Sequence, residues 1–311
     1  MTEQSHQTAR TQFVEANGIR FAYRGFGTDA GVPLVFLQHF RGGMDHWDPA
    51  VTDGFAEHRP VVLFDNAGVA ASTGETPDTI DAMADHAAGF IGALGLAQVD
   101  LLGFSIGGYI AQTLALRRPQ LIRRLILAGT GPRAGEPSRD SKYGEYGAAT
   151  DPETGAVPIE SFLYLFFRPS ETSQAAARAF WARRHVRKED VDPPTSAQTM
   201  AAQRAALTEW SQPRGERFAE LKSIEQPSLV VNGDNDIMVP TINSFTLSQN
   251  IPDAQLIIYP DAGHGALFQV PELFVAHAEM FLNGSGVIDL PTGPRRLMPR
   301  PGCPQRRRWR R

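Results

Sequence analysis

The chain has 311 residues, of which 42% are apolar, 30 are lysine or arginine and 34 are aspartate or glutamate. This composition lies near the globular average and excludes an intrinsically disordered chain. No apolar run reaches the roughly 18–20 residues that span a bilayer, and the first residues lack a signal-peptide pattern, so we expect a cytoplasmic protein. The single cysteine, Cys303, excludes internal disulfides and clustered cysteine metal sites.

Charge is distributed unevenly along the chain. Residues 284–311 contain eight arginines and one aspartate, a net charge of +7, which leaves −11 on residues 1–283. The acidic body gives no reason to expect binding to nucleic acid or to a membrane. The tail has proline, glycine and arginine without periodicity, which favours a disordered basic extension over a nucleic-acid arm. We therefore exclude 284–311 from the fold.

Strands and helices alternate through the first part of the chain. Residues 12–26 predict a hairpin with an Asn-Gly turn. A helix is expected after the Thr-Pro start signal at 76–77, and a second helix at 106–118. Four short apolar runs are typical of strands buried on both faces, as in a parallel sheet: 34–37, 61–64, 99–104 and 125–128.

The alternation stops after the fourth run and resumes near the end of the chain. Strands are expected at 228–232 and 255–259, and a final helix at 271–282. The intervening part starts with a Gly/Pro/Ser-rich stretch and continues with helical segments such as 159–167 and 172–185.

This order of elements predicts an α/β fold with a mostly parallel central sheet, flanking helices and right-handed crossovers. Residues 12–130 and 227–283 form the predicted core, and residues 131–226 form a helical insertion within it.

The strongest chemical signal is a serine flanked by glycines in the motif GFSIGG, residues 103–108. A predicted strand precedes this motif and a helix follows it directly. Such a turn lifts the hydroxyl of Ser105 clear of the sheet, beside helix N–H groups that stabilise negative charge. The alternatives are a structural glycine turn or a degenerate dinucleotide loop, in which Ser105 would replace the second glycine and the following strand would lack its acid. We favour a nucleophile.

A serine hydroxyl needs a base to accept its proton. The best candidate is His264, in the loop that follows the last predicted strand. His39 and His46 follow the first buried strand and precede the nucleophile. The remaining histidines fall on predicted helices, segment ends or a disordered chain start, where solvated positions are expected.

An acid that orients the histidine should follow a strand located between the serine and the histidine in the chain. Asp234 and Asp236 both follow the strand at 228–232, and we favour Asp236 because it lies further along the loop. The stretch lacks the downstream glycine and glutamate of a calcium-binding loop. The order Ser105, Asp236, His264 is the one expected for a triad built on strand ends of an open α/β sheet.

Together these residues resemble the α/β-hydrolase superfamily. The resemblance rests on the glycine-flanked serine, on the Gly-x-x-Asp loop that ends at 239–240, and on the Gly-His pair at 263–264. It covers roughly residues 12–283 and includes an Asp-x-x-Gly turn at 65–68. The GFSIGG motif is most similar to the esterase, lactonase and cofactor-free haloperoxidase branch. The resemblance implies that residues 131–226 form a lid over the active site.

The resemblance also implies an oxyanion hole. Aligned by Gly42 with the family's His-Gly-x-Pro-Gly motif, Phe40 takes the position whose backbone N–H donates to the oxyanion, and Ile106 supplies the second N–H. His39 stands in place of the usual glycine and Arg41 in place of the usual proline. Two interpretations of Arg41 remain open, because it either binds a substrate carboxylate or faces solvent beside a strand end.

Large apolar side chains are abundant in the insertion and on the loops around the predicted site. Most of them must pack the insertion against the core, while some are expected to line an apolar cleft suited to a small ester or lactone. The candidate pocket residues are Phe104, Arg41, Phe166, Trp181, Met238 and Leu267.

We expect a serine hydrolase that acts on small carboxylic esters or lactones through an acyl-enzyme, with no cofactor and no metal. The alternatives are a perhydrolase or haloperoxidase, a C–C hydrolase with the same triad, and a ligand sensor with little turnover. A serine nucleophile disfavours haloalkane dehalogenase and epoxide hydrolase chemistry. The expected partner is a small-molecule substrate, and the sequence does not predict the oligomeric state.

Overall fold

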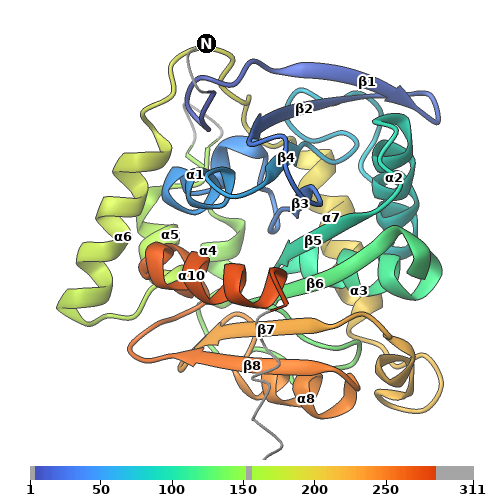
Figure 1. The fold of residues 1–311 in the computed structure, drawn as a ribbon. Helices are drawn as coiled ribbons and strands as arrows, with labels where there is room; N and C mark the ends of the chain where they lie inside the picture. Colours follow the sequence, from blue (N-terminus) through green and yellow to red (C-terminus); the bar gives the residue numbers. More distant parts are fainter. Residues whose placement is uncertain (1–3, 152–155, 285–311) are drawn as a thin grey trace, which may run out of the picture.

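The computed structural model describes residues 4–151 and 156–284 (Figure 1). Eight strands of these residues form one sheet in the order β1-β2-β4-β3-β5-β6-β7-β8. β1 pairs antiparallel with β2, and β2 with β4, whereas the other neighbours are parallel. The predicted α/β fold with a mostly parallel sheet is confirmed. The strands are β1 (Gln12–Ala16), β2 (Ile19–Gly27), β3 (Leu34–Leu37), β4 (Pro60–Phe64), β5 (Val99–Phe104), β6 (Ile122–Ala128), β7 (Ser228–Gly233) and β8 (Ala254–Tyr259).

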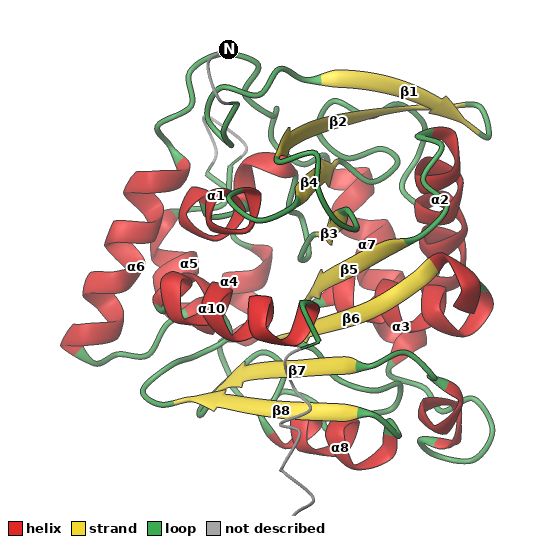
Figure 2. Ribbon diagram, in the orientation of Figure 1, coloured by secondary structure: helices red, strands yellow, loops and turns green. Residues whose placement is uncertain are grey.

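Helices pack on both faces of this sheet (Figure 2). α1 and α10 cover one face, and α2, α3 and α8 cover the other. Short 3-10 helices occur at 44–46, 119–121 and 219–223. The α-helices are α1 (Pro49–Ala56), α2 (Ile80–Ala93), α3 (Ile106–Arg117), α4 (Tyr143–Ala148), α5 (Ile159–Phe166), α6 (Glu171–Arg184), α7 (Ala197–Trp210), α8 (Ile242–Asn250), α9 (Ala266–Gln269) and α10 (Pro271–Leu282).

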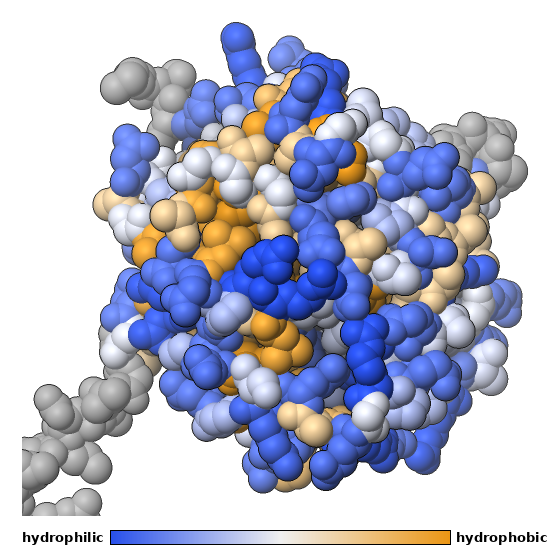
Figure 3. All heavy atoms as spheres, turned by 90° about the vertical axis from the view of Figure 1, so that its right-hand side faces the viewer, coloured by the Kyte–Doolittle hydropathy of each residue, from blue (hydrophilic) through white to orange (hydrophobic). Residues whose placement is uncertain are grey.

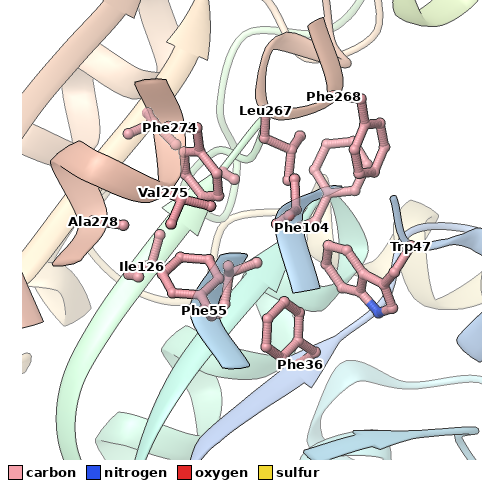
Figure 4. Packing of buried hydrophobic residues seen from close by; sticks show 14 of the residues in the cluster. Phe36, Trp47, Phe55, Phe104, Ile126, Leu267, Phe268, Phe274, Val275 and Ala278 are labelled. Carbon is pink, nitrogen blue, oxygen red and sulfur yellow. The ribbon is translucent and has the colours of Figure 1, made fainter. Parts of the chain in front are cut away.

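The central strands are apolar throughout because each of them contributes to two cores. In β3, Leu34 belongs to the core beneath α1 and α10, while the next residue, Val35, belongs to the core beneath α2 and α3. Figure 4 shows part of the first core, where the rings of Phe55 on α1 and Phe274 on α10 meet edge to face with centroids 5.9 Å apart. Side chains that alternate between faces therefore give the continuous apolar runs of a parallel sheet.

The start of α2 differs from the predicted start. The helix begins at Ile80, and its N-cap is Thr79, whose side chain accepts a hydrogen bond from the N–H of Ala82 at 3.3 Å. Thr76 instead donates to the carbonyl of Ala67 at 2.9 Å and lies 2.8 Å from the hydroxyl of Thr199 on α7. The Thr-Pro signal therefore belongs to a loop that is held by tertiary contacts.

Among the described residues, four helices, α4 to α7, occupy the segment between β6 and β7. The segments expected at 159–167 and 172–185 correspond to α5 and α6, whereas α4 and α7 have no counterpart among the named segments. In Figure 1, α4, α5 and α6 lie on the side toward which the arrows of β7 and β8 point. Phe162 of α5 and Phe180 of α6 are buried in the first core, whereas Trp210 of α7 is buried in the second. The segment is thus anchored to both layers of the core.

The beginning of the described chain is ordered by packing, contrary to the expected disordered start. His6 is fully buried, and its Nδ1 lies 2.9 Å from the hydroxyl of Thr52 on α1. Arg187 donates to the carbonyl oxygens of His6, Gln7 and Ala9. Burial lowers the pKa of His6 to about 3, so this imidazole is neutral at physiological pH.

The predicted basic tail, apart from residue 284, lies outside the described residues. Within them, no helix combines the length and the apolar character needed to cross a membrane. On the face of the molecule in Figure 3, apolar side chains form small groups separated by hydrophilic ones.

Candidate active site

Ser105 occupies a strained turn between β5 and α3. Its backbone has φ +57° and ψ −121°, a conformation that residues with a Cβ rarely adopt. Its N–H donates to the carbonyl of Ala128 at 2.9 Å, and its own carbonyl accepts from the hydroxyl of Thr130 at 2.8 Å. These bonds to the end of β6 hold the turn in place.

The two flanking glycines are required by close backbone approach. A Cβ on Gly107 would lie 2.0 Å from the carbonyl oxygen of Leu37, and a Cβ on Gly103 would lie 2.5 Å from the carbonyl oxygen of Gly107. Both distances are below any real Cβ contact. The glycines therefore let α3 begin directly against the ends of β3 and β5, which places Ser105 at the carboxyl edge of the sheet.

His264 and Asp236 form a buried pair on the loops after β8 and β7. The Nδ1 atom of His264 lies 2.7 Å from Oδ2 of Asp236, and neither side chain is exposed to solvent. The other oxygen of Asp236 accepts from the N–H groups of Met238 and Val239 at 2.8 and 2.9 Å. A carboxylate held in this way accepts the Nδ1 proton, so the lone pair of the neutral imidazole is on Nε2.

The second candidate acid does not contact His264. Asp234 is exposed and forms an ion pair with Arg168 of the inserted segment at 3.0 Å. Its oxygens also accept from the N–H groups of Asp261 and Ala262 at 3.2 and 3.3 Å. Asp234 thus connects the loop after β7 with the loop after β8, and Asp236 is the acid beside the histidine.

Ser105 and His264 line the same small cavity. The Nε2 atom of His264 is buried and has no hydrogen-bond partner among the described residues, so it is available to a ligand or to the serine hydroxyl. The His264 ring packs against two aromatic rings, with its centroid 4.9 Å from that of Phe104 and 5.2 Å from that of Phe166. In structures without substrate, the hydrogen bond between a catalytic hydroxyl and its histidine is often long, and it tightens only when substrate is bound.

The two predicted oxyanion donors are unpaired. The N–H groups of Phe40 and Ile106 donate no hydrogen bond to any described residue. For Ile106 the reason is that it is the first residue of α3, where the helix offers no acceptor. Phe40 lines the cavity with Ser105, in a turn closed by the bond from the N–H of Gly42 to the carbonyl of His39.

The cavity at Ser105 measures about 30 Å³, which is room for about two water molecules. Helices α4 and α5 of the inserted segment supply much of its wall, and the loops after β3 and β7 supply most of the rest. Its lining residues are His39, Phe40, Arg41, Ser105, Tyr146, Gly147, Val157, Phe162, Leu165, Phe166, Met238 and His264.

Three of the six candidate pocket residues, Arg41, Phe166 and Met238, line this cavity, and three do not. Phe104 points from β5 into the first core, where it packs against Trp47 and Phe268 (Figure 4). Leu267 is buried in the same core, and Trp181 of α6 lines a neighbouring cavity instead. The apolar character of these residues did not distinguish core packing from pocket lining.

Arg41 does not face solvent, so that interpretation is wrong. It is 4% exposed and has φ +65°, and its N–H donates to the side-chain oxygen of Gln203 on α7 at 2.7 Å. Its guanidinium donates to the carbonyl of Ala149 at 2.9 Å and to the hydroxyl of Thr150 at 3.1 Å. The side chain thus connects the loop after β3 with the inserted segment.

His39, which the sequence places in the loop after the first buried strand, is a wall residue of the cavity. Its Nδ1 donates to the carbonyl of Phe40 at 2.8 Å, and its ring meets those of Phe104 and Phe166 edge to face. Burial lowers the pKa of His39 to about 3, so its ring is neutral near pH 7. Within the described residues, no group of three or more His, Cys, Asp or Glu side chains is arranged to hold a metal ion.

Comparison with known proteins agrees with this architecture. A solved alpha/beta hydrolase fold protein from Chitinophaga pinensis is 40% identical, with a TM-score of 0.83 over 90% of this chain and 99% of that one. A pimeloyl-(acyl-carrier protein) methyl ester esterase from Nitrosomonas europaea is 28% identical over 258 residues, which are 80% of this chain and 95% of the relative. A 2-hydroxymuconate semialdehyde hydrolase from Pseudomonas sp. strain CF600 is 27% identical over 253 residues, 80% of this chain and 85% of the relative.

The sequence profile of the alpha/beta hydrolase fold matches residues 32–271, which include β3 to β8, the inserted helices and the loops that carry Ser105, Asp236 and His264. This chain belongs to the alpha/beta hydrolase fold family.

Proposed function

We propose that this protein is a serine hydrolase that cleaves small carboxylic esters or lactones through an acyl-enzyme on Ser105. The observation that carries the proposal is the meeting of Ser105, in its strained turn, with His264 in one cavity. Asp236 holds the histidine so that its unpaired Nε2 is the available base. A hydroxyl, a base and an orienting acid are the parts that nucleophilic acyl transfer requires.

In the first half of the reaction, Nε2 of His264 accepts the hydroxyl proton of Ser105 while Oγ attacks the substrate carbonyl carbon. The carbonyl oxygen becomes an oxyanion, which the unpaired N–H groups of Phe40 and Ile106 stabilise. The bond to the leaving oxygen then breaks, and His264 returns its proton to that oxygen. For an ester the product is an alcohol, and for a lactone the hydroxyl stays attached to the acyl group.

In the second half, His264 accepts a proton from water as the water oxygen attacks the acyl carbon. The bond between Oγ and the acyl carbon breaks, and Ser105 recovers the proton as the carboxylic acid leaves. Asp236 stays ionised throughout and stabilises the histidine each time it is protonated.

The walls of the cavity support an ester or lactone as the substrate. Phe162, Leu165 and Phe166 of α5 and Met238 give it a mostly apolar lining, with few polar groups besides the reacting ones. We infer that residues 131–226, through α4 and α5, act as the lid of the site. The similarity to a methyl ester esterase is consistent with this substrate class.

The test compares wild type with Ser105→Ala in the hydrolysis of p-nitrophenyl acetate and butyrate. We expect turnover by wild type and background rates for Ser105→Ala, with an unchanged melting temperature. Ser211→Ala is the matched control, because this exposed serine caps the C-terminus of α7 and does not line the cavity, and it should leave the rate unchanged. Equal activity of wild type and Ser105→Ala would contradict the proposal, and binding of esters without turnover would favour a sensor.

A further inference from the structure

A second cavity, of about 380 Å³, adjoins the cavity at Ser105. Arg41 and Val157 line both cavities, so the two share a wall. Ala156 also lines the second cavity, and its other walls are formed by the end of α6, by residues within 185–195 that follow it, and by the 3-10 helix at 44–46. The proposed acyl-transfer chemistry uses none of these additional residues.

The second cavity carries an excess of positive charge. Four cationic side chains line it, Arg41, Arg184, Arg187 and Lys188, against two carboxylates. The carboxylates are Asp45 and Asp192, and each accepts from the backbone N–H of the other, at 2.6 and 2.8 Å.

Those two carboxylates are also engaged by a cation outside the cavity lining. The fully buried Arg24 forms ion pairs with both Asp45 and Asp192. Burial also raises the pKa of Asp192 to about 7, which reduces its negative charge near neutral pH. The two acids are therefore shared between Arg24 and the four cations of the cavity, and positive charge remains in excess.

Three of the four cations have protein acceptors. Arg187 donates to backbone carbonyls near the start of the chain, Arg41 donates to Ala149 and Thr150, and Lys188 donates to the carbonyl of His185 at 3.0 Å.

Arg184, the last residue of α6, differs from them. It is 8% exposed, forms no hydrogen bond or ion pair with any described residue, and has both Nε and Nη1 buried without a partner. Buried N–H donors are rarely left unpaired in native proteins, so this group calls for an acceptor.

Aromatic rings hold the Arg184 guanidinium in place without satisfying it. Its central carbon lies 4.9 Å from the ring centroid of Phe162, 5.0 Å from that of Trp181 and 5.8 Å from that of Phe180. Stacking on ring faces leaves the in-plane N–H groups free for a planar anion. Phe162 also lines the cavity at Ser105, so one ring separates the guanidinium from that cavity.

We propose that Arg184 binds a carboxylate of the substrate, and that the preferred substrates are hemiesters, whose acyl part ends in a free carboxylate. This inference rests on the proposed function of Ser105. The ester carbonyl lies at Ser105, the acyl chain passes the shared wall, and the terminal carboxylate receives two N–H bonds from the planar guanidinium. Arg41 adds positive charge at the boundary between the two cavities.

The test uses pairs of substrates that differ only at the far end of the acyl chain: monomethyl adipate against methyl hexanoate, and monomethyl suberate against methyl octanoate. Methanol release gives kcat/KM for wild type, Arg184→Gln, Arg184→Lys and Arg178→Gln. Arg178→Gln is the matched control, because it removes the same charge from an exposed position of the same helix.

We expect wild type to prefer the hemiesters, and Arg184→Gln to lower the hemiester-to-neutral ratio of kcat/KM by about 10- to 100-fold, the range for loss of a hydrogen-bonded charge. Arg184→Lys should restore part of the ratio, and Arg178→Gln should leave it within about twofold, as for a surface charge. A structural role for Arg184 would lower both rates and leave the ratio unchanged, which would overturn the proposal. If Arg184→Gln does not fold, Arg184→Met, which keeps the stem on the aromatic rings, replaces it.

The failure of each proposal has its own signature. Hydrolysis that persists in Ser105→Ala would refute the proposed function whatever the ratio. If wild type cleaves none of the four esters, calorimetric titration with adipate decides on Arg184 alone. Binding by wild type that Arg184→Gln loses supports the site, whereas no binding, or equal binding by both proteins, refutes it.

Discussion

Replacing Asp236 with asparagine separates the two roles of its carboxylate. One oxygen accepts from two backbone N–H groups, of Met238 and Val239, and the other accepts from Nδ1 of His264. The amide of an asparagine can satisfy the first role only with its oxygen, so its NH2 group must face His264. Nδ1 then has to accept a hydrogen bond, and the imidazole proton moves to Nε2.

This change of tautomer removes the base from Ser105 while the loop keeps its backbone hydrogen bonds. We expect kcat for p-nitrophenyl butyrate to fall about 10,000-fold, equivalent to about 5.5 kcal/mol in the activation barrier, by analogy with the same change in serine proteases. The free energy of unfolding should fall by only about 1.5–3 kcal/mol, the value of one hydrogen bond to a charged group.

Asp234→Asn is the matched control for this experiment. Its carboxylate lies two residues earlier, is exposed and pairs with Arg168, so the same substitution should change kcat by less than about threefold, as for a surface pair. A loss of less than tenfold in Asp236→Asn, or equal losses in both variants, would refute the argument that Asp236 sets the tautomer of His264.

Three further predictions concern the stability of the fold. Gly107→Ala should destabilise the protein by about 3 kcal/mol or more, because its Cβ meets the backbone of β3. Gly92→Ala, at an open, exposed position of α2, should stabilise it by up to about 1 kcal/mol, and urea unfolding measures both changes. His6 and His39 are buried with pKa values lowered to about 3, so the stability they contribute is complete above pH 6.5 and is lost as pH falls toward 3. Between these pH values each histidine should add about 1.4 kcal/mol per pH unit to the slope of the unfolding free energy against pH. His6→Asn should reduce that slope, and an unchanged slope in the folded variant would contradict a lowered pKa for His6. Thr79→Ala should lower the free energy of unfolding by about 1 kcal/mol, because α2 loses its N-cap, and thermal denaturation measures the change. An unchanged stability would show that the cap contributes nothing.

The sheet could be predicted because its signal is local. Strands such as β5, at 99–104, are apolar on both faces, and each is followed by a helix or a loop with clear turn residues. The start of α2 differs from the expected one because Thr76 and Thr79 are both good N-caps in sequence. The choice between them depends on contacts of Thr76 with residues far along the chain, among them Thr199.

The candidate site was predictable to the extent that backbone geometry demands particular residues. Ser105 needs glycines beside it, and an acid followed by a histidine on later strand ends completes the pattern. No sequence pattern of this kind marks a charged side chain as buried. Neither Arg41, for which the sequence left a solvent-facing position open, nor Arg184 is marked as buried by the sequence, and only the packing of distant segments around them shows that both are. Phe104 and Leu267 lie in the first core and not in the cavity wall, which again depends on the packing of distant segments.

The central claim is that Ser105 is an activated nucleophile, and covalent labelling tests it most directly. Wild type and Ser105→Ala are treated with a small fluorophosphonate, and the intact masses and the tryptic peptides are measured. We predict a single adduct in wild type, located on the peptide that contains Ser105, and no adduct in Ser105→Ala. An adduct on another residue, or none in folded wild-type protein, would contradict the account.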